Sequence, residues 1–386
     1  MNGWPLCSLA SVASVFNGKT PSRADQRNEG HPVLKIKDVS AEGEFRGKFE
    51  SFIEASFSSR YANKLLRAGD SLILNAAHNA SYVASKKYFA EPEALGSLIT
   101  GEWLVIRPFS SAMDPRFVYH WLSLPKTQTD LRELVNGIHL YPKDVALLRI
   151  PTPVLAQQRR IVEVLDQAQE LIKKRRRATV LIDDLAQSIF LEMFGNPIRN
   201  ERSWPVGTVS SFVKGFESGK SLAEGEDEHA SRFRILKISA VTSGRFLARE
   251  SKPAPEGYVP PLAHIVHGGD LLFSRANTSE LIGATAFVSG GTENMLMPDK
   301  LWRFVWNDEV KPSPWFVHYL FKQYSMREII SKNSSGSSGS MKNISQGKVL
   351  SIKLGIPPVK LQREFEERIL MAVSYTHLTL PTILRV

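Results

Sequence analysis

The longest uninterrupted feature of this chain is a stretch of 40 residues, 155–194, that contains neither glycine nor proline. Pro153 fits the first turn of a helix and Thr152 can cap it, while Gly195 and Pro197 end it. The sequence therefore predicts one helix over residues 155–194. At a rise of 1.5 Å per residue, such a helix is roughly 60 Å long, which exceeds the width of a small domain.

Apolar residues recur along this stretch at alternating steps of four and three residues, the spacing of a coiled coil. This seam is apolar at both ends and polar around Arg175 and Thr179. It predicts packing against a second helix, and the alternative is a long amphipathic helix that lies on an ordinary core. The residues expected at this helix and subunit interface are Ile161, Leu165, Ala168, Ile172, Ile182, Ile189 and Met193.

Short sequence matches recur in the same order in the two halves of the chain, at offsets of 199–206 residues. They predict a duplicated domain, because this period is too long for a solenoid repeat. The matched pairs are Trp4-Pro5 with Trp204-Pro205, Gly18-Lys19-Thr20 with Gly219-Lys220-Ser221, Leu34-Lys35-Ile36 with Leu236-Lys237-Ile238, Gly69-Asp70 with Gly269-Asp270, residues 117–120 with 316–319, Ile150-Pro151 with Ile356-Pro357, and Gln158-Arg159 with Gln362-Arg363.

The expected fold is α+β (mixed α/β), with two duplicated domains built on small twisted sheets and separated by the long, coiled-coil-forming helix. We expect the first domain over residues 1–150, the helix as a spacer over 151–196, the second domain over 197–355, and the start of a second long helix over 356–373. That second helix begins at Leu361 and stops near Ala372. Residues 374–386 fit no heptad and contain Pro381, so they are expected to be a non-native tail; a genuine divergent tail is the alternative.

Shorter segments predict the elements of each domain. Trp4 and Trp204 are expected as core anchors, and residues 333–340 as a flexible loop. The expected strands are 33–36, 71–75, 103–106 and 147–150 in the first domain and 235–238, 270–274, 301–306 and 349–354 in the second, and the expected helices are 114–124, 127–136 and 314–331.

The composition limits the class of protein. The chain has 386 residues, a net charge of +10 and a pI near 9.5, which favours a nucleic-acid partner. Cys7 is the single cysteine, so a disulfide framework within the chain and cysteine-rich zinc sites are excluded. With no membrane-spanning run and no signal peptide, the sequence predicts a cytoplasmic protein.

The sequence carries no recognisable catalytic motif. Gly18-Lys19-Thr20 lacks the upstream glycine of a phosphate-binding loop and predicts an ordinary turn. No glycine-rich cofactor fingerprint follows a strand, and no histidine pair proposes a metal site. A binding role fits better: two similar basic domains held apart by a stiff rod could contact two DNA segments. Because the copies differ in their loops, the target should be asymmetric and bipartite.

One family resemblance rests on two segments. Residues 150–161, with Gln157-Gln158-Arg159-Arg160, and the stretch that ends in Phe194-Gly195-Asn196-Pro197 resemble the central conserved helix of type I restriction-modification specificity subunits. Residues 271–283 are similar to a stretch of their target-recognition domains. The resemblance covers roughly residues 1–372, and its helix segment is the more specific part.

This resemblance implies a sequence-specific, non-catalytic subunit that binds double-stranded DNA. Each target-recognition domain would read one half of a split target. The helices would pair antiparallel, set the spacing and dock two methyltransferase subunits, with restriction/translocase subunits completing the complex. The complex would methylate adenine at N6 or restrict DNA. S-adenosylmethionine, ATP and Mg²⁺ are expected on the partner subunits, and no cofactor or metal on this chain.

Basic and amide side chains are the candidates for DNA contact, since Lys and Arg neutralise phosphates and Asn, Gln and Arg read base edges. A solvated surface position is the alternative for each, and likewise for the basic run 173–177. The candidates are Lys19, Arg23, Lys37, Asn75, Asn79, Lys86 and Lys87 in the first domain and Lys220, Lys237, Arg275, Asn277, Thr278, Lys300, Lys342 and Asn343 in the second. The alternative functions are a stand-alone DNA-modifying enzyme and a two-domain protein-binding scaffold.

Overall fold

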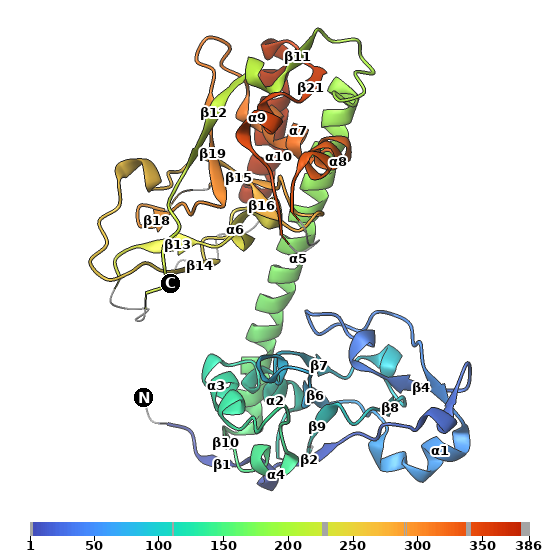
Figure 1. Cartoon of the computed structure of the whole chain (residues 1–386). Coiled ribbons are helices and arrows are strands. Elements are labelled where there is room, and N and C mark those ends of the chain that lie inside the picture. Colours follow the sequence, from blue (N-terminus) through green and yellow to red (C-terminus); the bar gives the residue numbers. More distant parts are fainter. Residues whose placement is uncertain are drawn as a thin grey trace. The chain divides into compact units, whose positions relative to one another are not determined.

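The computed structural model describes residues 3–109, 112–225, 231–288, 290, 292–336 and 341–379, with side chains described up to residue 372. The chain divides into two compact units, which are unit 1 over Met1–Lys174 and unit 2 over Arg175–Val386 (Figure 1). Each contains helices and small sheets, as the mixed fold class predicted. No helix in the described part of the chain is long and apolar enough to cross a membrane.

Both units contain the same four-stranded antiparallel sheet, which confirms the internal duplication. Leu72 pairs with Val105 in unit 1, and Leu272 pairs with Arg303 at the matching place in unit 2. The strand order is β2 (Ala13–Asn17), β9 (Trp103–Pro108), β6 (Ser71–Leu74) and β7 (Lys87–Phe89) in unit 1, and β12 (Val213–Ser218), β19 (Leu301–Trp306), β15 (Leu271–Ser274) and β17 (Thr285–Phe287) in unit 2.

A second, smaller sheet in each unit contains one parallel pair, and a third pair of strands joins the ends of each domain. The parallel pairs are β4 (His31–Leu34) with β8 (Leu98–Ile99), flanked by β5 (Phe52–Ile53) and β3 (Gln26–Arg27), and β13 (Arg234–Leu236) with β18 (Met295–Leu296), flanked by β14 (Ser251–Pro253). The end-joining pairs are β1 (Leu6–Ser8) with β10 (Arg149–Pro151) and β11 (Val206–Thr208) with β21 (Lys353–Gly355).

Short helices cover these sheets. Asp114 caps α2 by accepting from the backbone N–H groups of Arg116 and Phe117, and Ser313 caps α7 in the same way through Phe316. The helices are α1 (Ala55–Arg60), α2 (Pro115–Trp121), α3 (Pro125–Glu133) and α4 (Pro142–Val145) in unit 1, and α6 (Ser239–Thr242), α7 (Pro314–Lys322), α8 (Tyr324–Asn333), α9 (Gln346–Leu350) and α10 (Val359–Thr379) in unit 2.

The long helix α5 spans Leu155–Phe194, as the sequence predicted. Gly195 follows it with φ +66°, the left-handed conformation that favours glycine after a helix. The predicted cap was wrong, because the Thr152 hydroxyl donates to the carbonyl of Pro5. The buried amide of Gln158 instead accepts from the Asp114 N–H at 2.8 Å and donates to the Pro153 carbonyl at 2.8 Å.

The second long helix is longer than expected. It runs over Val359–Thr379, so the predicted stop near Ala372 was wrong. Gln362 repeats the contacts of Gln158, accepting from the Ser313 N–H at 3.2 Å and donating to the Pro357 carbonyl at 2.9 Å. Of the tail, residues 374–379 belong to this helix and residues 380–386 lie outside the described part.

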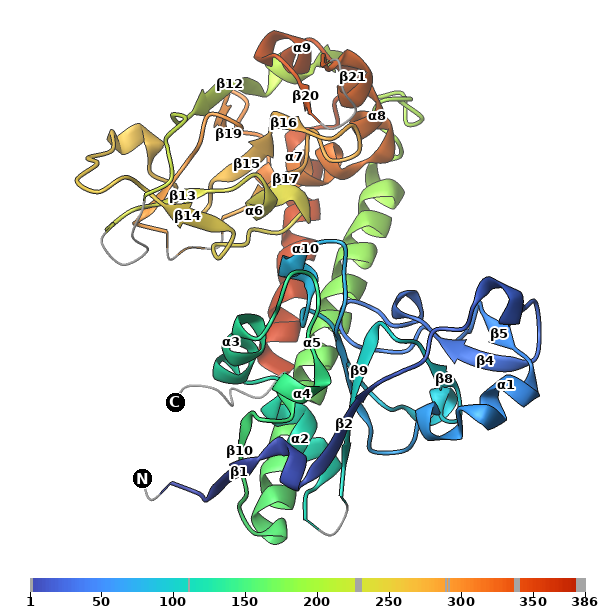
Figure 2. The same ribbon diagram turned by 60° about the horizontal axis from the view of Figure 1, so that its bottom comes forward.

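The helix α10 lies beside the C-terminal half of α5 (Figures 1 and 2). The Phe365 ring contacts Phe190 at 5.5 Å and Phe194 at 5.6 Å between ring centroids. Ile189 and Met193 pack against the same core. This end of the α5 seam is therefore covered even though α10, with 21 residues, is shorter than α5, with 40. Phe190 and Phe194, which the heptad steps passed over, are fully buried.

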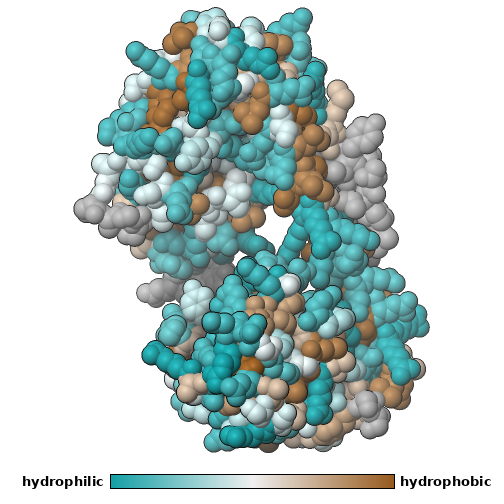
Figure 3. Space-filling model, turned by 90° about the vertical axis from the view of Figure 1, so that its right-hand side faces the viewer, coloured by the Kyte–Doolittle hydropathy of each residue, from teal (hydrophilic) through white to brown (hydrophobic). Residues whose placement is uncertain are grey.

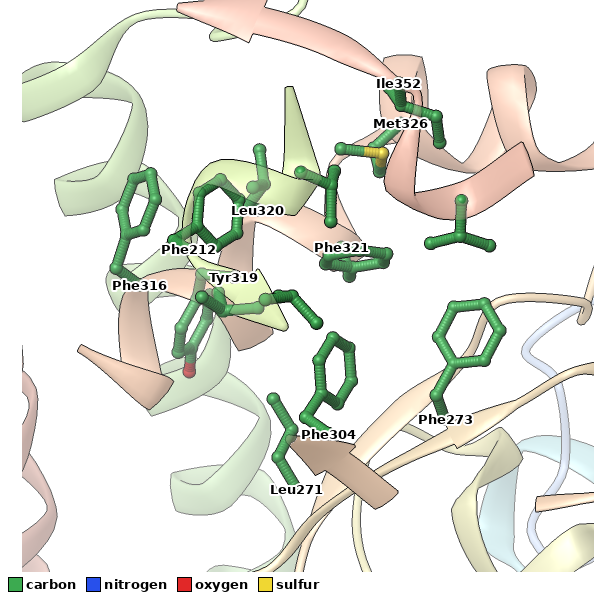
Figure 4. Close-up of a cluster of buried hydrophobic side chains, with 14 of the residues drawn as sticks. Phe212, Leu271, Phe273, Phe304, Phe316, Tyr319, Leu320, Phe321, Met326 and Ile352 are labelled. Atoms are coloured by element: carbon green, nitrogen blue, oxygen red, sulfur yellow. The ribbon is translucent and has the colours of Figure 1, made fainter. Parts of the chain in front are cut away.

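An aromatic core fills unit 2 and connects its sheet to its helices (Figure 4). Phe273 from β15 stacks on Trp302 from β19 with ring centroids 5.6 Å apart, and Phe304 contacts Phe321 from α7 at 5.3 Å. Burial of rings of this size contributes most of the hydrophobic stabilisation of such a domain. The face shown in Figure 3 is mostly hydrophilic, with small separate hydrophobic areas.

Several predicted boundaries need correction. The predicted helix 314–331 is two helices, because Gln323 is extended (ψ 136°) between α7 and α8. The predicted strand 349–354 begins as α9 and becomes strand only at Lys353, and the strand 147–150 begins at Arg149. A short apolar run cannot by itself distinguish a buried helical turn from a strand. Of the predicted loop 333–340, residues 337–340 lie outside the described part.

Trp4 and Trp204 differ from each other although the sequence matches them. Trp4 is 48% exposed, so it is not the predicted core anchor. Trp204 is half-buried, and its Nε1–H donates to the Phe194 carbonyl at 3.0 Å, which caps the end of α5. Residues 195–203 carry Trp204 back onto the end of α5.

Candidate nucleic-acid interface

Equivalent chain segments leave the central sheet of each unit at the same place. After β6, the N–H of Asn75 donates to the carbonyl of Glu102 at 2.9 Å; after β15, the N–H of Arg275 donates to the carbonyl of Lys300 at 3.1 Å. Positions 75 and 275 therefore match, as do positions 102 and 300, each of which directly precedes the long strand of its sheet.

A returning segment completes this site in both units. In unit 1, Ala76 forms a bridge with His139, and Leu140 donates to the Asn75 carbonyl at 2.8 Å. In unit 2, β16 (Ala276–Asn277) pairs with β20 (Lys342–Asn343), and Ile344 donates to the Arg275 carbonyl at 3.0 Å. Each unit thus presents its own side chains on one backbone scaffold at one end of the sheet.

In unit 1 this scaffold borders a cavity of about 730 Å³ with mostly apolar walls. Exposed Glu102 contributes a carboxylate, which accepts a long hydrogen bond of 3.4 Å from the Thr100 hydroxyl. Asn75, whose backbone N–H donates to the Glu102 carbonyl, is only 3% exposed. The cavity is lined by Ile36, Ala41, Leu74, Ala76, Ala77, His78, Asn79, Tyr82, Ser85, Lys86, Glu102 and Ile138.

In unit 2 the same scaffold carries cationic and amide groups. The guanidinium of Arg275 lies over the Trp302 ring at 5.7 Å, and its Nε is buried with no hydrogen-bond partner among the described residues. Asn277 donates to the Ser274 hydroxyl at 3.3 Å and accepts from the Thr278 N–H at 2.9 Å. The structure thus brings together six predicted residues: Arg275, Asn277, Thr278, Lys300, Lys342 and Asn343.

The predicted residues of unit 1 do not converge in the same way. Lys37 forms an ion pair with Glu50 on the surface. Lys86 lines the cavity, and its ammonium donates to the Ile36 and Val39 carbonyls at 3.1 and 2.9 Å. Its pKa lies below the usual range, mainly because burial disfavours the charged form and also because Arg46 is near.

Lys87 and Asn79 have local structural roles. The Lys87 ammonium donates to the Ser123 hydroxyl at 2.8 Å, and burial lowers its pKa to about 8. Asn79 accepts from the N–H of Ser81 at 3.0 Å and caps a short turn beside the cavity. Four of the remaining candidates are exposed on the two units, namely Lys19, Arg23, Lys220 and Lys237.

Gly18 and Gly219, which begin the repeated Gly-Lys-Thr/Ser tripeptides, lie in segments that are neither helix nor strand and pack closely against neighbouring backbone. A Cβ atom on Gly18 would lie 2.2 Å from the Thr100 carbonyl oxygen, and one on Gly219 would lie 1.5 Å from that of Met297. Both distances are shorter than real Cβ contacts, so only glycine fits where these segments meet the neighbouring chain. The repeat of this tripeptide has a steric cause.

Glu102 is the site residue that the sequence reading missed. One sequence signal pointed to it, because Glu102 directly precedes the predicted strand 103–106. His78 and Tyr82, which also line the cavity, follow β6 in a segment whose matches to unit 2 are too weak to align by residue type.

The helix α5 exposes apolar residues near its middle. Leu165 and Ile172 of the predicted seam are 36% and 48% exposed, whereas Ile161 packs against the unit 1 core. Ala168 and Ile182 are half-buried. The basic run 173–177 is exposed, and Lys173 forms an ion pair with Glu44 of unit 1 at 2.7 Å.

Comparison with known proteins agrees with this architecture. Residues 1–181 match the family model described as a type I restriction modification DNA specificity domain. Over 398 aligned residues, 97% of this chain and 82% of the relative, the chain is 22% identical to the type I restriction enzyme EcoKI specificity subunit of Escherichia coli strain K12.

Two further matches are partial or distant. The chain is 27% identical to the EcoEI specificity subunit of Escherichia coli, over 41% of this chain and only 27% of that protein's length. Its fold is similar to the crystal structure of a type I restriction-modification S subunit from M. genitalium, with a TM-score of 0.51 and 12% identity, covering 97% of this chain and 91% of that one. The first 181 residues thus match the DNA specificity domain of type I restriction-modification systems, and nearly the whole chain is similar in sequence and fold to type I restriction-modification specificity subunits.

Proposed function

We propose that this chain reads a split, asymmetric sequence of double-stranded DNA, with unit 1 reading one half and unit 2 the other. The carrying observation is that one backbone scaffold recurs in both units but bears the exposed Glu102 in one and the half-buried Arg275 and Lys300 in the other. Base edges are distinguished by such donor and acceptor side chains in the major groove. Two scaffolds with different side chains therefore suit two different half-sites.

The exposed cations supply the phosphate contacts in this proposal. Lys19 and Arg23 of unit 1 and Lys220 and Lys237 of unit 2 are exposed, and the chain carries a net charge of +10. Contacts to phosphate position a protein on the duplex without reading its sequence. Binding should therefore combine a steep salt dependence with a sequence preference, whereas a protein-binding scaffold would have neither.

The middle of α5 is the proposed spacer and docking surface for two methyltransferase subunits. Its exposed apolar residues, Leu165, Ile172, Val180, Leu181 and Leu185, would be covered by those partners. Restriction/translocase subunits would join this assembly to cleave DNA. In this proposal S-adenosylmethionine, ATP and Mg²⁺ are held by the partner subunits, which carry out N6-adenine methylation and restriction.

A methylation map tests this function. The chain is co-expressed with a methyltransferase subunit encoded beside it, and host DNA is sequenced for N6-methyladenine. The expected result is a split, asymmetric motif that disappears when this chain is omitted. A methylated motif that persists without this chain, or a purified complex that binds all duplexes equally, would contradict the proposal.

Exchange of one domain tests the division of labour. Residues 1–150 are replaced by the corresponding domain of another family member. One half of the methylated motif should change while the other half and the spacing persist. If both halves changed, the assignment of one half-site to each unit would be wrong.

A further inference from the structure

The two units differ in a way that points to the bases they read. Resting on the function proposed above, we infer that Glu102 makes unit 1 select an A·T pair and that Arg275 makes unit 2 select a G·C pair through its guanine. The two positions lie on the same scaffold, one residue pair apart in the same hydrogen-bonded ladder. The base preference of each half-site is thus decided by opposite charges at neighbouring positions of one scaffold.

The match of the two sites rests on backbone contacts rather than on residue type. The N–H of residue 75 or 275 donates to the carbonyl of residue 102 or 300, and the carbonyl of residue 75 or 275 accepts from residue 140 or 344. In both units this segment leaves the strand at the centre of the sheet. The side chains at these positions therefore meet a bound duplex from equivalent places in each domain.

In unit 1 the scaffold offers an acceptor beside an apolar wall. The Glu102 carboxylate is acceptor-only when ionised, so it can accept from the exocyclic N6 amino group of adenine but not face the O6 of guanine. Ile36, Leu74 and Ile138 line the adjoining cavity and supply apolar contact for a methyl group. An A·T pair presents both features in the major groove, the adenine amino group and the thymine C5 methyl.

Lys86, a lysine that lines this cavity, does not oppose the preference of Glu102 for an A·T pair. The Lys86 ammonium donates to the carbonyls of Ile36 and Val39, which take two of its three N–H donors. Glu102 thus keeps a carboxylate whose contact inside the unit is the long hydrogen bond from Thr100. The cytosine N4 amino group could also donate to it, but a G·C pair has no methyl group for the apolar wall.

In unit 2 the scaffold offers donors. Arg275 is half-buried, and its guanidinium lies over the Trp302 ring, 5.7 Å from the ring centre. A guanidinium can donate to O6 and N7 of guanine together, which is the commonest specific contact of proteins with DNA bases. Lys300 places a second positive charge at the position that Glu102 occupies in unit 1, and this charge also disfavours an amino-bearing base edge.

Selection from a randomised duplex library tests the inference with the purified complex of this chain and its co-expressed methyltransferase subunit. Wild type should select a split motif. In Glu102→Lys, the enrichment of an A·T pair at one position of the unit 1 half should fall by roughly tenfold or more. In Arg275→Ala, the enrichment of guanine at one position of the unit 2 half should fall by a similar factor. Each variant should leave the other half unchanged.

Matched controls separate these effects from charge and folding. Glu133→Lys makes the same charge change at an exposed position of α3, and Arg249→Ala removes an exposed arginine of unit 2. Both should select the wild-type motif. Glu102→Ala adds no positive charge and should show the same loss of A·T preference as Glu102→Lys. Circular dichroism and the thermal midpoint verify that each variant is folded.

The outcomes distinguish this inference from the function on which it rests. If the wild-type complex selects no sequence, the proposed function fails and the inference fails with it. If wild type selects a split motif but Glu102→Lys and Glu102→Ala leave it intact, the inference alone is wrong. It is also wrong if the position that Glu102 controls is a G·C pair, or if Arg275→Ala alters the unit 1 half.

Discussion

The side chains of His120 and Asp166 connect α2 to α5, with Nε2 of His120 lying 2.7 Å from Oδ1 of Asp166. Arg116 donates to the same carboxylate at 2.8 and 3.2 Å. Burial acts to raise the pKa of Asp166, but the hydrogen bonds from Arg116 and His120 outweigh it and hold the pKa below its ordinary 3.8. The charged carboxylate therefore helps to fix the start of α5 to the first domain.

Unit 2 fixes its own part of α5 with a second aspartate. Tyr319 is the residue that matches His120 in the repeat, and its hydroxyl donates to the Asp183 carboxylate at 3.2 Å. Lys322 forms an ion pair with the same carboxylate. Burial again opposes the charged form, and the Lys322 contact outweighs it, so the pKa of Asp183 is lowered. Each recognition domain thus has its own polar attachment to the long helix.

Asp166→Asn should destabilise unit 1 by about 1 kcal/mol at pH 7, because it replaces a charge-assisted contact that is partly screened by solvent. Since the folded pKa is lower than the unfolded one, this contribution is complete above the unfolded pKa and is lost as pH falls through the folded pKa. Urea denaturation at pH 7 and below pH 4 measures it. Glu163→Gln, at an exposed position of α5, is the control. An unchanged difference at low pH would contradict the assignment.

His318 should make unit 2 sensitive to mild acid. Its Nδ1 lies 2.9 Å from the Thr285 hydroxyl in the core, and burial lowers its pKa from 6.5 to about 3. Below pH 6.5 the unfolded state takes up the proton first, so stability should fall by up to about 1.4 kcal/mol per pH unit. His318→Gln should flatten this slope between pH 6.5 and 4. Exposed His267→Gln should not, and an equal slope in all three proteins would refute the assignment.

Gly219→Ala should destabilise unit 2 by about 1–3 kcal/mol, because the added methyl group overlaps the Met297 carbonyl and the turn must move. Gly215→Ala is a matched control, since its Cβ would have no neighbour within 4 Å. The thermal midpoints of the two variants measure the difference. A midpoint for Gly219→Ala that equals that of Gly215→Ala would mean that the close approach is not required.

Gln158→Ala should cost about 1–3 kcal/mol, because it leaves the buried Asp114 N–H and Pro153 carbonyl without the side chain that joins them. The neighbouring Gln157 is exposed, so Gln157→Ala should be close to neutral. Denaturant midpoints of the two variants give the comparison. Equal midpoints would show that water satisfies both backbone groups once the amide is removed.

Lys87 and Lys19 should separate stability from DNA binding. Lys87→Met removes a half-buried ammonium bonded to Ser123 and should leave the salt dependence of DNA binding unchanged. Lys19→Met should lower the slope of log affinity against log salt by roughly 0.9, the value for one phosphate contact. Fluorescence anisotropy at several salt concentrations measures both slopes. A lower slope for Lys87→Met would show that the Lys87 ammonium contacts a DNA phosphate.

Local sequence patterns predicted both ends of α5 correctly. The 40 positions without glycine or proline, and the glycine that ends the helix, act through residues that are near in sequence. The duplication was equally visible, since Gly18 and Gly219 recur for a steric reason that allows no other residue. Boundaries failed where burial decided them. Val349 is fully buried, and because a buried apolar residue fits a helix or a strand equally well, only packing placed it in α9.

The candidate site was predictable by residue type in unit 2 and much less so in unit 1. Arg275 and Asn277 follow a recognisable strand, and they meet Lys342 because β16 pairs with a segment about 65 residues later. In unit 1, Lys86 and Lys87 have the composition of a DNA surface, yet their ammonium groups are bonded to carbonyls and a hydroxyl inside the domain. Charge in a sequence does not reveal which cations the fold will use internally.

The linear order of residues was sufficient for the family resemblance, the repeat and the long helix, since each depends on spacing along the chain. Tertiary structure was needed to place Glu102 opposite Asn75 and Lys300 opposite Arg275, because these contacts form between strands that are distant in sequence. The same hydrogen-bonded ladder then carries an anion in one domain and cations in the other. The physical reason is that backbone pairing is independent of side-chain type, so one scaffold can hold opposite chemistry.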